Sequence, residues 1–193
     1  MNHRIRLAMA SGTFQKLSGT VETDETYIGG LSKNMSAADR KRKVTGTGGM
    51  DKVAIHGALE RGGKVVAAVV ERVTQKSLET SVRNWVELGS TVYTDQSHFY
   101  NLLGANYVHQ SVNHGTGEYV RDDVHTNSIE SFWNLYKRAW KGTYTHNAPK
   151  HTERYIAERT FSFNNRDLTD YERLATVTAS VSGKRLTYAE LKA

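Results

Sequence analysis

Apolar and polar positions follow the period of a strand in the first third of the chain. β-Branched and aromatic residues dominate 20–28, and two glycines end the run at 29–30, which predicts a strand. Two further apolar runs, 53–59 and 64–73, are joined by the polar, glycine-containing segment 60–63. That spacing predicts a β-hairpin. The first third should therefore supply three strands.

In the second part of the chain, apolar residues recur at the spacing of a helix. Helices are expected at about 78–86, 98–103, 126–141 and 150–163, and short strands at 91–94 and 107–112. Three consecutive strands followed by alternating helices and strands predict a mixed sheet with helices packed against it. The same order is found in RNase H-like folds. The expected fold class is α/β, an RNase H-like mixed sheet flanked by helices.

Composition narrows the class of protein. The chain has 193 residues, no cysteine, and 26 Lys and Arg against 20 Asp and Glu, for a net charge of +6. The length suits one domain. Without cysteine there is no disulfide scaffold, cysteine nucleophile or cysteine-ligated zinc. No apolar run approaches the roughly 20 residues of a membrane span, so we expect a cytoplasmic protein with no membrane partner, and the basic excess favours a polyanion.

Carboxylates occur where strands normally carry other residues. Asp24 lies within the first strand, on the same face as Glu22 and Thr26, and Asp95 ends the fourth strand. A solvated edge strand would explain the first acid, and a helix N-cap would explain Asp95. Alternatively, a bound metal ion would relieve charge repulsion at Asp24, and ligands of open α/β sheets commonly bind where strands end. Taken singly, the two acids leave these interpretations open.

The helix expected at 126–141 carries a polar stripe beside its apolar face. The apolar face consists of Ile129, Phe132, Trp133, Tyr136 and Trp140, and the stripe of Asn127, Glu130, Asn134, Lys137 and Lys141. Glu130 and Lys137 differ in direction by only about 20°. Such a stripe is usually a solvated face. Here it also places a carboxylate and a lysine two turns apart on one side of the helix.

Several long motifs carry a resemblance to a known family. The segments VETDETYIGG, VYTDQSHFYNLL and HTNSIESFWNLYKRAWKGTYTH, followed by KHTERYIAERTFSFNNR, closely resemble the transposase domain of bacterial insertion sequences of the ISXO-like group. These are DDE-type transposases with an RNase H-like fold. The resemblance runs from about Val21 to Arg166. It implies a lead-in segment at 1–19, a catalytic domain at 20–166 and a C-terminal extension at 167–193.

In this group two aspartates and a third residue, glutamate or asparagine, hold two divalent metal ions. By the resemblance, Asp24 corresponds to the first acid and Asp95 to the second. The favoured third ligand is Glu130, with Asn127 as the alternative on the same helix. Lys137 matches a basic residue that contacts DNA near the reacting end. The expected ions are magnesium, with manganese as the alternative, since hard cations prefer oxygen ligands.

Basic residues gather in two places. Arg40, Lys41, Arg42 and Lys43 lie in a polar, glycine-rich insertion, and Lys137, Arg138 and Lys141 lie on the helix of the third motif. Runs of charge are often simply solvated, whereas runs that face DNA neutralise its phosphates. The two interpretations stand level for the first group. Both groups are the expected DNA-binding residues.

The resemblance implies a metal-dependent enzyme that cleaves and joins double-stranded DNA, at element ends and at a target. It further implies a homodimer on DNA, associated with the nucleoid of a bacterium. Two alternatives stay open: a truncated, catalytically silent DNA-binding remnant that regulates an intact transposase, and an RNase H-like nuclease. Relatives generally carry an upstream DNA-recognition region, often with zinc-binding cysteines. This chain begins just before the expected catalytic domain and has no cysteine, so it is expected to be either a truncated copy or one that finds DNA by other means. The retained Asp24, Asp95 and Glu130 argue against the silent remnant.

Overall fold

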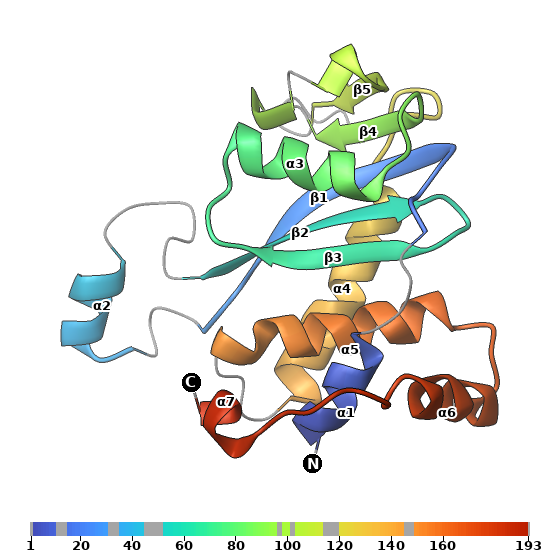
Figure 1. Cartoon of the computed structure of the whole chain (residues 1–193). Helices are drawn as coiled ribbons and strands as arrows, with labels where there is room; N and C mark the ends of the chain where they lie inside the picture. Colours follow the sequence, from blue (N-terminus) through green and yellow to red (C-terminus); the bar gives the residue numbers. More distant parts are fainter. Residues whose placement is uncertain are drawn as a thin grey trace.

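A single mixed sheet organises the chain. The computed structural model describes residues 2–10, 15–30, 35–44, 52–95, 98–100, 103–113, 120–144 and 149–192. Within these residues, five strands pair in the order β3-β2-β1-β4-β5 (Figure 1). They are β1 (Thr20–Ile28), β2 (Val53–Glu60), β3 (Val65–Val70), β4 (Thr91–Asp95) and β5 (Val108–Val112). The first three are antiparallel, and β4 and β5 run parallel to β1. This topology confirms the predicted RNase H-like fold.

Strand β1 is central, although it carries three carboxylates. It pairs with β2 on one side and with β4 on the other, so the edge-strand interpretation of its acids is wrong. Its partner β2 is buried along almost its whole length. The turn between β2 and β3 contains Gly62 at φ 72°, a conformation that favours glycine. The predicted hairpin is confirmed.

Helices cover both faces of the sheet (Figure 1). They are α1 (Asn2–Met9), α2 (Ala37–Lys43), α3 (Gln75–Trp85), α4 (Asn127–Gly142), α5 (Thr152–Asn164), α6 (Asp170–Ala179) and α7 (Tyr188–Lys192). On one face, α4 and α5 pack their apolar side chains against β1, β2 and β3. On the other face, α3 packs against the central strands. In the described part of the chain, no helix has the length and apolar content needed to cross a bilayer.

Three of these helices do not follow from the apolar pattern. Helix α2 lies in the polar insertion, and α6 and α7 lie in the weakly patterned C-terminal segment. Helix α6 buries none of its residues, and its large apolar side chains Tyr171 and Leu174 are exposed. Capping residues mark both C-terminal helices instead: Thr169 pairs with Glu172, and Thr187 with Glu190. A capping box of this type was the available signal.

The helix that crosses β1 comes very close to the sheet at one glycine. Gly57 of β2 pairs with Asp24 of β1, and the indole of Trp133 from α4 lies directly over it. A Cβ added at Gly57 would come within 2.7 Å of two atoms of that ring. Only a residue without a side chain allows α4 to pack at this depth.

Gly57→Ala should therefore displace Trp133 and destabilise the protein by about 1–3 kcal/mol, as is usual for overpacked cores. Urea unfolding followed by tryptophan fluorescence measures the change. Gly104→Ala is the matched control, because a Cβ there meets nothing within 4 Å. An unchanged unfolding midpoint for Gly57→Ala would show that α4 packs less closely than described.

His56 is buried on the opposite face of β2. Thr23 Oγ1 donates to the Gly57 carbonyl at 2.9 Å and so accepts from His56 Nε2 at 2.8 Å. Burial lowers the pKa of His56 from 6.5 to about 3. In the unfolded chain the same imidazole is protonated below about pH 6.5. Acid therefore favours unfolding through this residue.

Relative to a His56→Gln variant, the wild type should lose about 2 kcal/mol of unfolding free energy between pH 7 and pH 5. Urea unfolding of both proteins at the two pH values gives this difference, and the comparison cancels groups that titrate in both proteins. The loss should be complete near pH 3, where the folded imidazole also takes up a proton. Equal pH dependence in the two proteins would mean that the folded His56 is protonated freely.

Candidate active site

Two neighbouring parallel strands bring Asp24 and Asp95 together. Strands β1 and β4 pair in parallel, from Thr20 with Thr91 to Glu22 with Tyr93. Continued for two more residues, this register sets Asp24 level with Asp95. Parallel pairing thus joins two acids that are far apart in the sequence.

Helix α4 adds Glu130 and Lys137 at the same place. It packs on β1 and β2, and its side chains close a pocket of about 330 Å³. The pocket is lined by Asp24, Glu25, Thr26, Asp95, Glu130, Trp133, Asn134 and Lys137. The two aspartates, the favoured glutamate and the lysine singled out in the sequence therefore face one space.

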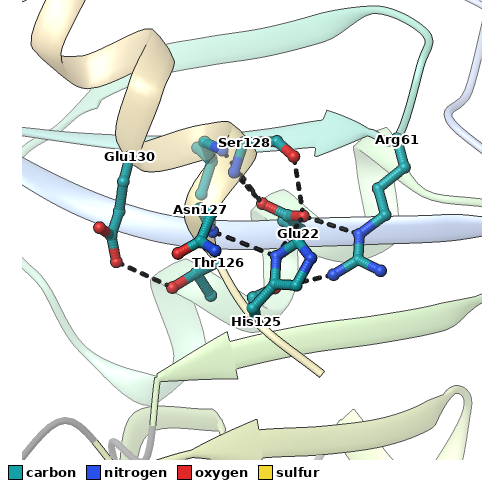
Figure 2. A network of polar contacts seen from close by, with 8 residues as sticks. Glu22, Arg61, His125, Thr126, Asn127, Ser128 and Glu130 are labelled. Atoms are coloured by element: carbon teal, nitrogen blue, oxygen red, sulfur yellow. Dashed lines mark hydrogen bonds and ion pairs between the residues drawn. The ribbon is translucent and has the colours of Figure 1, made fainter. Parts of the chain in front are cut away.

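Hydrogen bonds orient two of the carboxylates. Trp133 Nε1 donates to Asp24 Oδ2 at 3.1 Å, so the indole that packs over Gly57 also holds the first acid. Thr126 Oγ1 donates to Glu130 Oε1 at 3.0 Å (Figure 2). Both acids are thus held by side chains from α4 or its N-cap.

The electrostatics of the pocket reflect its acidic lining. Burial raises the pKa of Asp24 from its usual 3.8 to about 6. The negative charges of Glu130 and Asp95 also raise it, while hydrogen bonds from the Glu25 backbone and from Trp133 lower it. A cation near these carboxylates would favour the ionised form of Asp24.

The donor set suits a hard divalent cation, since magnesium prefers carboxylate oxygens. The carboxylates of Glu130 and Asp95 repel that of Asp24, and a divalent cation would compensate this excess of negative charge. Among the described residues, however, no three His, Asp or Glu side chains are grouped closely enough to hold a metal ion between them. The pocket therefore supplies ligands of the right chemistry, although the described residues do not form a completed metal centre.

Asn127, the alternative third ligand, lies outside the lining of this pocket. It is the first residue of α4 and its side chain is exposed. Its backbone N–H donates to His125 Nδ1 at 3.4 Å. The structure thus brings Glu130, and not Asn127, to the two aspartates.

The predicted DNA-binding residues occupy two separate helices. Lys137 lines the pocket, and Arg138 and Lys141 are exposed further along α4. Arg40 and Lys41 are exposed on α2, which lies apart from α4 (Figure 1). The side chains of Arg42 and Lys43 lie outside the described residues.

Glu22 is the site residue that sequence analysis missed. It is 0% exposed, although it lies two positions before Asp24 on the same face of β1. Arg61 Nε donates to Oε1 at 2.7 Å, and the backbone N–H of Ser128 donates to Oε2 at 2.8 Å (Figure 2). The alternation along β1 placed Glu22 on the same face as Asp24, which is the face that α4 covers. Its partners come from distant segments, so no local pattern could have indicated them.

A larger pocket lies elsewhere, between α1 and the C-terminal segment, with a volume of about 680 Å³. Its described lining includes His3, Arg4, Arg6 and several tyrosines, and it contains no Asp or Glu. The acids singled out in the sequence line the smaller pocket beneath α4 instead.

Comparison with known proteins identifies relatives of the chain. The ISXO2-like transposase domain model matches residues 16–164. An uncharacterized protein in transposable element ISH50 of Halobacterium salinarum is 30% identical over 131 residues, which are 63% of this chain and 45% of that protein. The chain thus spans less than half the length of this relative.

Two solved viral structures are also similar in part. The HTLV-2 integrase catalytic core domain in complex with magnesium (trimeric form) gives a TM-score of 0.42 at 12% identity, over 84% of this chain and 98% of that one. The simian T-cell lymphotropic virus intasome in complex with the PP2A regulatory subunit B56 gamma gives 0.41 at 17% identity, over 90% and 58%. The family match is the informative one, because it includes the segments that carry Asp24, Asp95 and Glu130. The chain belongs to the family of ISXO2-like transposase domains.

Proposed function

We propose that this domain is the catalytic part of a DDE-type transposase that cleaves the ends of a bacterial insertion sequence and joins them to target DNA. One observation carries the proposal. Within a transposase family, Asp24, Asp95 and Glu130 come from three distant segments and line one pocket with Lys137. Acids that only interact with solvent would not need to line the same pocket.

In this proposal, Asp24, Asp95 and Glu130 hold two divalent metal ions, magnesium or alternatively manganese. Such a pair, when bound, activates an attacking oxygen and stabilises the departing oxygen in an in-line displacement. The protein's own part is to orient the ligands. Trp133 holds one oxygen of Asp24, and Thr126 holds one oxygen of Glu130. Both carboxylates are therefore fixed before DNA enters.

The proposed reaction consists of two displacements at phosphorus. Water first attacks the phosphodiester at the element end and releases a 3′-hydroxyl. That hydroxyl then attacks a phosphodiester of the target, forming a new bond and releasing a 3′-hydroxyl of the target strand. Neither step needs a covalent protein intermediate, so a chain without cysteine can carry out both.

The basic residues form the proposed DNA-binding surface. Lys137 contacts the backbone near the reacting phosphate, and Arg138 and Lys141 extend this contact along α4. Such contacts position DNA without reading its sequence. The run at 40–43 supplies a second group of phosphate contacts. In a bacterial cytoplasm the partner is the double-stranded DNA of the nucleoid, on which a homodimer holds two element ends.

Asp24→Asn, Asp95→Asn and Glu130→Gln should each lower cleavage of element-end DNA by more than about 100-fold, since even residues behind metal ligands are worth 10–100-fold. The substrate is a duplex that carries the inverted repeat flanking the gene. DNA affinity, measured by fluorescence anisotropy, should stay nearly unchanged. Asp167→Asn, in an exposed turn after α5, is the matched control and should retain activity.

Asn127→Ala separates the two candidates for the third ligand, and activity should survive this change. An inactive Asn127→Ala beside an active Glu130→Gln would transfer the role to Asn127. Full cleavage by Asp24→Asn or Asp95→Asn would rule out the metal assignment. Wild-type cleavage without joining would favour the nuclease, and binding without cleavage would favour the silent remnant.

Neutralising Arg40, Lys41, Arg42 and Lys43 to glutamine should reduce the salt dependence of DNA binding. Each phosphate contact contributes about 0.9 to the slope of log K against log salt concentration. Titrations at several salt concentrations measure the slope, with a Lys137, Arg138 and Lys141 triple glutamine variant for comparison. A slope equal to that of the wild type would mean that the run at 40–43 is solvated in the complex.

A further inference from the structure

The carboxylate of Glu22 is completely buried where α4 begins. Glu22 is 0% exposed, and burying an ionised carboxylate is costly unless it is paired and hydrogen-bonded. Its partners are Arg61 Nε at 2.7 Å, the backbone N–H groups of Ser128 at 2.8 Å and Ile129 at 3.1 Å, and Ser128 Oγ at 3.0 Å. Every one of these groups donates to Glu22.

The two backbone donors belong to the first turn of α4. The first N–H groups of a helix have no partner within the helix, and a side chain of the N-cap residue normally accepts from one of them. Thr126 is the N-cap of α4, yet its side chain makes no capping hydrogen bond. Glu22 accepts from these amides instead. A strand residue thus caps a helix that begins more than a hundred positions later in the chain.

Thr126, the N-cap residue, orients a carboxylate and does not cap the helix. Its hydroxyl donates to Glu130 Oε1 at 3.0 Å (Figure 2). Glu130 is the carboxylate that α4 brings to the pocket. Capping by Glu22 and orientation of Glu130 thus both act on the first turn of α4, within one network of polar contacts (Figure 2).

Arg61 holds this network from the other side. It lies in the turn between β2 and β3, and its Nη2 donates to the His125 carbonyl at 3.2 Å. Its guanidinium also lies over the Tyr93 ring, 4.8 Å from the ring centre. The arginine thus contacts Glu22, the segment before α4 and strand β4 together. His125 Nδ1 lies 3.3 Å from Glu22 Oε1 and completes the cluster.

We propose that Glu22 is a positioning residue: paired with Arg61, it caps α4 from β1 and thereby sets where Glu130 and Lys137 stand relative to Asp24 and Asp95. Helix α4 is tied to β1 at two points on one face of the strand, at Glu22 and, through Trp133, at Asp24. Without the first tie, the end of α4 that carries Glu130 loses its fixed distance from the aspartates. The activity readout of this role rests on the proposed transposase function, and the amide-exchange readout does not.

Glu22→Gln is the decisive variant, because it keeps the shape of the side chain and removes its charge. Hydrogen exchange at the Ser128 and Ile129 amides should accelerate at least about tenfold. The magnesium concentration for half-maximal cleavage should rise by about tenfold, the lower end of the effect expected of residues that support metal ligands. DNA affinity should change less than about twofold, since none of the phosphate-contacting residues is altered.

Glu172→Gln is the matched control. Glu172 also accepts a capping hydrogen bond, from the Thr169 N–H at the start of α6, but it lies outside the pocket. It should alter the unfolding midpoint without moving the magnesium requirement. A merely structural role for Glu22 would produce the same result as this control.

Unchanged amide exchange, or an unchanged magnesium requirement in an active Glu22→Gln enzyme, would overturn the positioning role while leaving the transposase proposal intact. If the wild type does not cleave, the transposase proposal fails and the exchange rates still decide the cap. If Glu22→Gln does not fold, Glu22→Asp keeps the charge on a shorter side chain. That variant should fold with faster exchange at the same two amides, and unchanged exchange would again overturn the role.

Discussion

The close approach of α4 to the sheet determines the geometry of the whole site. The helix can lie this deep because β2 offers Gly57 beneath the indole of Trp133. From that depth the indole reaches Asp24, and the next turn towards the N-terminus brings Glu130 to the same pocket. A helix held further out by one methyl group would still cover the apolar core, but its polar stripe would no longer meet the strand acids.

Local periodicity was sufficient to predict most of the scaffold. Strands β1 to β3, the hairpin and helices α3, α4 and α5 follow from apolar spacing and turn residues, because these segments bury a continuous face. Helix α6 has no buried face and was therefore missed. The central position of β1 was also hidden, since three carboxylates in nine residues suggest an exposed edge. Only its pairing with β4 and the partners of Glu22 explain how such a strand is buried.

The candidate site was likewise predictable from the sequence only in part. Asp24, Asp95, Glu130 and Lys137 could be named from motifs, and the structure gathers them in one pocket. The motifs could not decide between Glu130 and Asn127 as the third ligand, because the helical period places both residues on the same side of the helix. The hydrogen bonds of Trp133, Thr126 and Glu22 depend on tertiary contacts between distant segments, and spacing along the chain contains no information about them.

The alternation of acids along β1 also determines how the strand can align during folding. A shift by one residue would exchange the two faces of the strand and move Glu22 and Asp24 towards α3. On that side they would meet a cluster that includes Leu78, Val82 and Val92, with neither Arg61 nor the α4 amides within reach. The buried carboxylates therefore discriminate against misaligned pairing as well as serving the site. Correct alignment of β1 is therefore required both for folding and for the proposed chemistry.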